Sequence, residues 1–210
     1  MITLYYSPGT AALVVHWLLI ELEVPHQLHK LDLDAGEHKQ PAYLAINPSG
    51  VVPALVIDNK PICEAAAIAL YLAEAHPARG FAPEPGTLAR AAYYQWMFFL
   101  ANTLQPAFRA WFYPTEPAGE AHVDAVKDKA RGRIEGAFAQ LDGHLAAHGP
   151  YLLGDKPSTP DFMLTMLMRW SRNMPRTATA WPALARHAAA MKARPPFKEV
   201  YAREGLTDWT

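Results

Sequence analysis

Hydrophobic and polar positions follow two different patterns along the chain, and the change comes near residue 80. Before it, short β-branched and aromatic runs alternate with longer runs whose apolar residues recur at helical spacing. The predicted strands are Ile2–Tyr6, Gln27–Leu33, Val51–Ile57 and Lys60–Ile62, and the predicted helices are Thr10–Leu22 and Glu64–Ala75. The order β-α-β followed by β-β-α predicts an α/β domain over residues 1–78.

After this domain the pattern becomes helical throughout. Prolines and glycines mark residues 79–86 as a linker, and no later run is typical of a strand. Helical spacing covers Thr87–Phe112, Ala118–Ala147, Pro160–Asn173, Trp181–Ala193 and a short run near Phe197–Arg203. Ser158 and Asp161 form a variant capping box, in which each side chain bonds to the backbone of the other residue. We therefore expect an all-α domain over residues 87–210.

Composition and charge exclude several classes of protein. Hydrophobic residues make up 51% of the 210 residues, enough for a real core, and 19 basic against 20 acidic residues argue against nucleic-acid binding. The single cysteine, Cys63, excludes an internal disulfide and a cysteine-rich zinc site, and is typical of the reducing cytoplasm. No lysine or arginine precedes Glu21 and no uninterrupted apolar run is long enough to span a bilayer, so we expect neither a signal peptide nor membrane insertion.

The turn Tyr6-Ser7-Pro8-Gly9-Thr10 joins the first predicted strand to the first predicted helix. Unpaired amides and the positive end of a helix dipole favour an anion at such a turn. If the anion is a thiolate, these groups and a nearby hydroxyl lower the pKa of the thiol from about 8.5. The alternative is that Thr10 only caps the helix.

Two later segments carry weaker signals. Pro53 lies inside an apolar strand pattern, so it marks either an ordinary strand start or a cis bond that turns the Val52 backbone outward toward an extended ligand. Glu64 opens a helix, where it either serves the helix end alone or accepts a ligand ammonium while the neighbouring amides hold a carboxylate. Cys63 is more typical of an inert core thiol than of a nucleophile.

Together, and in this order, these segments resemble the glutathione transferase superfamily over essentially the whole chain, with delta/theta-like and beta-like bacterial features. The resemblance implies a thioredoxin-like N-terminal domain, an all-α C-terminal domain and a homodimer with its site between the domains. It also implies a cis Val52–Pro53 bond, with the Val52 backbone pairing to the cysteinyl part of glutathione. Glutathione is then the co-substrate, and no metal is expected.

The resemblance extends to single glutathione-binding positions. His38 and Lys39 match a region where related classes contact the glycine carboxylate, although a solvated loop is an equal alternative. Glu64 matches the acidic half of a Glu-Ser pair for the γ-glutamyl group. Ala65 replaces the serine, so one hydroxyl contact is lost while the backbone N–H remains.

Three residues are candidates for the thiolate donor. Aligned with delta-class-like enzymes, Thr10 stands where they have the activating serine, and it is the first candidate, followed by Ser7 and then Tyr6. Aligned with beta-class enzymes, Ala11 stands where they have a cysteine and Gln105 where they have a histidine. Mixed-disulfide chemistry of the beta type is therefore not expected.

Aromatic and methionine side chains in the second domain suit an apolar electrophile. The candidates are Phe108, Trp111 and Phe112 on one helix, and Met166, Arg169 and Trp170 at helical spacing on another. The alternative is that these stripes are core. The sequence thus predicts a glutathione transferase that activates the thiolate for attack on an apolar electrophile. The competing hypothesis is a non-catalytic glutathione-binding or protein-interaction member of the same fold.

Overall fold

A four-stranded mixed sheet organises the first part of the chain. The computed structural model describes all 210 residues and divides them into two units, residues 1–82 with 192–210, and residues 83–191. The strands are β1 Ile2–Tyr6, β2 Gln27–Lys30, β3 Ala54–Ile57 and β4 Lys60–Cys63. Their order is β2-β1-β3-β4, with β1 parallel to β2 and antiparallel to β3, and β3 antiparallel to β4. All four strands were predicted from the sequence, with β2 and β3 shorter than expected.

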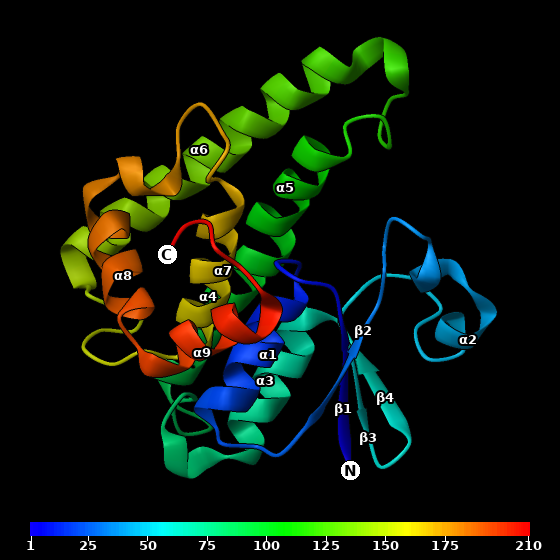
Figure 1. Cartoon of the computed structure of the whole chain (residues 1–210). Coiled ribbons are helices and arrows are strands. Elements are labelled where there is room, and N and C mark those ends of the chain that lie inside the picture. Colours follow the sequence, from blue (N-terminus) through cyan, green and yellow to red (C-terminus); the bar gives the residue numbers. More distant parts are fainter. The chain divides into compact units, whose positions relative to one another are not determined.

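The helices of this first unit are α1 Ala12–Glu21, α2 Pro41–Leu44, α3 Ala65–Ala75 and α9 Pro195–Glu204. Figure 1 shows α1 and α3 side by side on one side of the sheet, with α2 on the other. Every residue of α1 is buried, because the helix contacts β1, α3 and α9. A helix covered on all sides needs no polar face, which explains its nearly continuous apolar sequence.

The C-terminal residues 192–210 make their contacts with this first unit. Phe197 of α9 lies 5.0 Å, ring to ring, from Trp17 of α1. The guanidinium of Arg194 donates to the Glu21 carboxylate at 2.6 and 2.7 Å. An aromatic contact and a bidentate ion pair therefore attach α9 and its N-cap residue Arg194 to α1, and Arg194 and Glu21 are 173 residues apart along the chain.

The second unit is helical: α4 Leu88–Phe99, α5 Gln105–Phe112, α6 Val123–His148, α7 Thr159–Trp170 and α8 Pro182–Lys192. In Figure 1, α5 runs beside the long α6. The helix predicted over residues 87–112 is interrupted by a π-helical turn, Leu100–Leu104. Pro106 has no N–H to donate to the carbonyl of Asn102, so the helix widens for one turn before continuing.

The predicted capping box at the start of α7 is present: Ser158 and Asp161 bond to each other's backbone, and both are buried. No helix of the structure has both the length and the apolar character that crossing a membrane requires.

Candidate active site

The strand register brings three of the predicted site segments to one edge of the sheet. Tyr5 of β1 is paired with Ala54 of β3, and Ala54 is paired with Cys63 of β4. The chain leaves the sheet beside this row at three places: after β1, before β3 and after β4. The turn with Thr10, the Val52–Pro53 segment and Glu64 therefore all begin from neighbouring positions in the first unit.

The turn after β1 is closed by its own hydrogen bonds. The Thr10 hydroxyl donates to the Ser7 carbonyl at 2.6 Å and accepts from the amide of Ala12 at 3.3 Å. Gly9 has a φ of +68°, in the left-handed region that glycine adopts without a steric penalty. Thr10 thus closes the turn and accepts from the first amide of α1, whose N-cap residue is Ala11.

Other donors of this turn have no partner in the chain. Neither the Ser7 hydroxyl nor the amide of Ala11 makes a hydrogen bond to another residue. Tyr6 is 6% exposed, and burial, followed by the charge of Glu204, raises the pKa of its phenol. The turn therefore offers a hydroxyl and an amide to an anion, beside a phenol that keeps its proton.

The segment before β3 is held through the residue that precedes Val52. The Val51 carbonyl accepts from the Tyr43 hydroxyl and from Asn47 Nδ2, both at 2.7 Å. Burial raises the pKa of Tyr43 to about 12, so this donor stays protonated. The Val52–Pro53 bond is cis, and the backbone N–H and C=O of Val52 bond to no residue of the chain.

Lys39 is attached to the same segment. Its Nζ donates to the Gly50 carbonyl at 2.7 Å, and a Cβ on Gly50 would lie 2.9 Å from that Nζ. An ammonium has three N–H groups, so two remain for another acceptor. His38 is half-buried beside it, and its Nδ1 has no hydrogen-bond partner.

The junction between β4 and α3 has an unusual backbone. Glu64 has φ +70° and ψ 110°, a conformation that costs free energy in a residue other than glycine. Its side chain is exposed and does not cap α3, so the first amides of that helix lack a side-chain acceptor. Burial, followed by the charge of Glu64, raises the pKa of the Cys63 thiol, which disfavours a nucleophilic role for it.

Sequence reasoning missed one contributor to this site, Glu204 at the end of α9. Its carboxylate accepts from the amide of Gly9 at 2.8 Å and contacts His16 Nδ1 at 2.9 Å. The side chain of His16, in α1, is fully buried. The sequence did offer a signal for Glu204. A carboxylate in the last turn of a helix is unfavourable next to the negative end of the helix dipole, so its presence there indicates a stabilising contact elsewhere.

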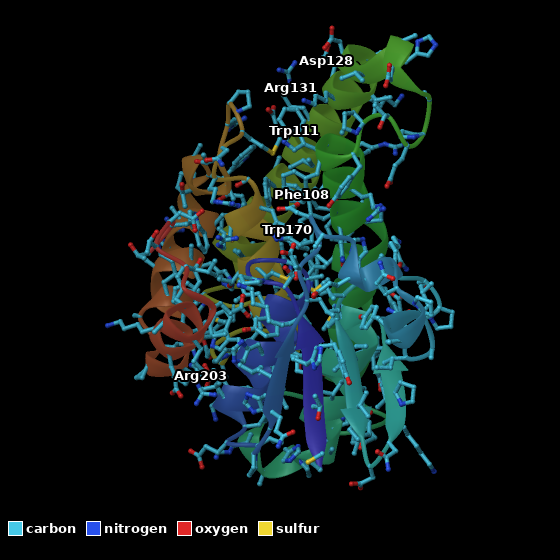
Figure 2. The ribbon with its side chains drawn as sticks, turned by 45° about the vertical axis from the view of Figure 1, so that its right-hand side comes forward. Phe108, Trp111, Asp128, Arg131, Trp170 and Arg203 are labelled. Atoms are coloured by element: carbon cyan, nitrogen blue, oxygen red, sulfur yellow. The ribbon has the colours of Figure 1, made fainter.

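The predicted electrophile residues lie in the second unit and differ in exposure. Phe108, Phe112 and Trp170 form a ring cluster, with centroids 5.8 to 6.0 Å apart. Figure 2 shows Phe108 and Trp170 next to each other, with Trp111 farther along α5. Phe112 is 45% exposed, and Trp111 and Trp170 are half-buried.

Three of the six candidates have little surface to offer: Phe108 is fully buried, Met166 is 1% exposed and Arg169 is 3% exposed. The core interpretation therefore describes these three side chains, whereas Trp111, Phe112 and Trp170 keep accessible ring surface.

The sheet topology and the donor-bearing turn after β1 define a thioredoxin-like unit, which this chain joins to a helical one. Two family models match, "Glutathione S-transferase, N-terminal domain" over residues 1–74 and "Glutathione S-transferase, C-terminal domain" over residues 124–203. The chain belongs to the glutathione S-transferase family.

Individual relatives agree with this assignment. Glutathione S-transferase GST-4.5 of Xanthomonas campestris is 31% identical over 169 residues, which are 80% of this chain and 81% of the relative. The crystal structure of a glutathione transferase from Methylococcus capsulatus has 28% identity and a TM-score of 0.89, covering 99% of this chain and 100% of that one. A glutathione transferase homologue from Sulfitobacter, solved with bound glutathione, has 27% identity and a TM-score of 0.90, covering 99% of each chain.

Proposed function

We propose that this glutathione transferase binds glutathione along the sheet edge of its first unit and ionises the thiol at the turn after β1. The observation that carries the proposal is the set of unpaired polar groups at that edge, on Val52, at the start of α3 and on the turn. The Sulfitobacter homologue was solved with glutathione bound, which supports the same ligand here.

Each part of the tripeptide has a complementary group. The N–H and C=O of Val52 can pair with the cysteinyl residue as an added strand would. The amides of Ala65 and its neighbours in the first turn of α3 can hold the γ-glutamyl carboxylate, and the exposed Glu64 can accept from the γ-glutamyl ammonium. His38 and Lys39 are the proposed contacts for the glycine carboxylate, through a charge-assisted hydrogen bond.

The thiolate is proposed to accept from the Ser7 hydroxyl and the Ala11 amide, with Thr10 holding the turn. Thr10 was the first candidate from the sequence, but its one hydroxyl proton already goes to the Ser7 carbonyl. Tyr6, the third candidate from the sequence, can still donate, because its raised pKa keeps the phenol protonated beside the turn. These donors stabilise the thiolate relative to the thiol, and each pKa unit of lowering is about 1.4 kcal/mol.

The chemical step is proposed to be attack of the thiolate sulfur on an electrophilic carbon. A carbon–sulfur bond forms, and the leaving group departs with its electron pair. Trp111, Phe112 and Trp170 are the proposed contacts for an apolar electrophile, because their rings keep accessible surface.

Titration of the bound thiol tests the donor assignment. The pKa of bound glutathione is measured by ultraviolet difference spectroscopy in the wild type and in Ser7→Ala, Thr10→Val and Tyr6→Phe variants. We expect a thiol pKa below the free value of about 8.5 in the wild type, raised most by Ser7→Ala. A larger rise in Thr10→Val would return the donor role to Thr10, and an unshifted wild-type thiol would refute the proposal.

A glutathione-binding or interaction protein without turnover is the second candidate function. Two departures from the family pattern favour it: Ala65 lacks the serine hydroxyl and Ala11 lacks the cysteine of beta-class enzymes. Retention on immobilised glutathione and turnover of an activated aryl halide separate the two functions. Retention without turnover supports the second, and retention with turnover supports the transferase.

A cytoplasmic homodimer is also part of the proposal. The single free Cys63 is compatible with a reducing compartment. Large apolar side chains are exposed on α3 and α4: Tyr71 at 43%, Leu88 at 90% and Phe98 at 53%. Exposed apolar surface supports contact with a second copy. Light scattering should give the mass of a dimer for the wild type and a smaller mass for Phe98→Glu, and a monomeric wild type would contradict the homodimer.

A further inference from the structure

Glu204 occupies a place that is unfavourable for a carboxylate. It is the last residue of α9, where the negative end of the helix dipole repels an anion, and its side chain has no exposed surface. A buried carboxylate is tolerated only when it is paired and hydrogen-bonded. The contacts that offset these costs therefore indicate what Glu204 does.

One of the two contacts is with the turn proposed to hold the thiolate, and the other is with the helix that follows the turn. One carboxylate oxygen accepts from the amide of Gly9 at 2.8 Å, and the other contacts His16 Nδ1 at 2.9 Å. Gly9 lies between Ser7 and Thr10 in the turn, and His16 lies in α1, which follows it. One carboxylate thus fixes the turn and the helix behind it to the same point of α9.

The surroundings of this carboxylate are closed. The ring of His16 lies 5.7 Å from the ring of Tyr6 and 5.6 Å from that of His26. On the same helix, Arg203, which Figure 2 labels, forms an ion pair with Glu199 and not with Glu204. The carboxylate therefore acts on the turn through its two hydrogen bonds.

We propose that Glu204 is a positioning residue for the thiolate site, acting through the Gly9 amide with His16 as its second anchor. It sets the backbone of the turn so that the Ser7 hydroxyl and the Ala11 amide converge on one point. The C-terminal helix thereby becomes part of the apparatus that ionises glutathione. This inference rests on the proposed function of the turn.

A matched pair of carboxylates in the first unit makes the test specific. Glu204 and Glu21 both connect α9 to α1, but Glu21 bonds to Arg194 and Trp17 and has no contact with the turn. Glutathione thiol pKa, the pH profile of kcat/KM and the KM for glutathione are measured in the wild type, Glu204→Ala, Glu204→Asp and Glu21→Gln. An activated aryl halide serves as the electrophile.

In Glu204→Ala the loss of a negative charge by itself favours the thiolate, as that charge raises the pKa of Tyr6. We expect the misalignment of the turn donors to outweigh this effect, so that the pKa of the bound thiol rises by about one unit, which is a tenfold loss of thiolate at pH values below it. kcat/KM should fall about tenfold near neutral pH and recover above the raised pKa. The KM for glutathione should stay within about threefold, because Val52 and α3 still bind the tripeptide. Glu21→Gln should lower stability and leave the thiol pKa unchanged.

Glu204→Asp keeps the charge but shortens the side chain by one methylene, so it should raise the thiol pKa by a smaller amount. This variant replaces Glu204→Ala in the test if Glu204→Ala does not fold. A wild-type thiol pKa in either Glu204 variant overturns the inference, as does an equal rise in Glu21→Gln. A wild type that does not lower the thiol pKa at all instead overturns the proposed function, which keeps the two failures distinct.

Discussion

Each unit of the molecule contains one buried carboxylate that accepts from backbone amides. Asp161 in the second unit accepts from the amides of Ser158 and Leu152, both at 2.8 Å. Glu204 in the first unit accepts from the amide of Gly9 at 2.8 Å. Neither side chain is exposed, and a histidine lies next to each.

The two carboxylates differ in how far along the chain they reach. Asp161 bonds to residues three and nine positions before it, and so fixes the start of its own helix. Glu204 bonds to residues 188 and 195 positions before it, and so fixes a turn in another part of the fold. The same chemistry therefore stabilises a helix end in one unit and shapes a candidate active site in the other.

The largest expected effect is on stability, in Asp161→Ala. Loss of this carboxylate removes the capping box and leaves two buried amides without an acceptor, which should cost about 3 kcal/mol of the free energy of unfolding. Urea unfolding measures the loss, and the thiol pKa should not move. A change below about 1 kcal/mol, or a shifted thiol pKa, would contradict the division of roles between Asp161 and Glu204.

The difference in sequence separation also explains why one of these two contacts was predicted from the sequence and the other was not. Ser158 and Asp161 lie within four residues, so their capping box is visible as a local pattern and was predicted correctly. The contact between Glu204 and Gly9 requires that α9 packs on α1, which no local pattern encodes. The C-terminal helix was therefore predicted as an element, but its contact with α1 was not.

Three segments of the candidate site gave weak local signals, and their binding roles, with the positions His38, Lys39 and Ala65, came from the resemblance to the family. The turn after β1, Val52–Pro53 and Glu64 each interrupt a periodic run, and the structure places them at one edge of the sheet. The sequence could not show which hydroxyl of the turn is already hydrogen-bonded. In the structure the Thr10 hydroxyl donates to the Ser7 carbonyl, while the Ser7 hydroxyl bonds to no other residue.

Double-mutant cycles should separate the two networks by their coupling energies. His16 Nδ1 lies 2.9 Å from the Glu204 carboxylate, whereas His187 Nδ1 lies 3.8 Å from the Asp161 carboxylate. Because coupling between buried partners falls with distance, we expect about 2 kcal/mol between His16 and Glu204 and less than about 1 kcal/mol between His187 and Asp161. Unfolding of the single and double alanine variants gives both values, and a larger coupling in the second unit would reverse the comparison.

Glycine variants should show a smaller effect on stability with the same contrast in function. Gly9 and Gly154 have φ values of +68° and +113°, and an alanine at either position should cost about 1 kcal/mol or more. Only Gly9→Ala moves the amide that Glu204 holds, so only this variant should raise the pKa of the bound thiol. Equal thiol pKa values in the two variants would show that the turn tolerates displacement.

The smallest expected effect is a difference in pH dependence between the units. Burial lowers the pKa of His26, beside His16, from 6.5, and burial raises the pKa of Asp161 from 3.8. A depressed histidine pKa means that the unfolded state binds the proton more tightly, so stability is lost as the pH falls below 6.5. A raised carboxyl pKa has the opposite sign, because stability is lost as the pH rises above 3.8.

The His26→Gln variant isolates the first of these two contributions. Between about pH 7.5 and pH 5.5 the wild type should lose more stability than the variant, because glutamine has no proton to bind in the unfolded state. The imidazole Nδ1 donates to the Val24 carbonyl at 2.7 Å, and the glutamine amide can replace that donor, so the two proteins should be equally stable at the higher pH. Urea unfolding at both pH values measures the difference. An equal loss in the two proteins would mean that acid destabilises the first unit through a group other than His26.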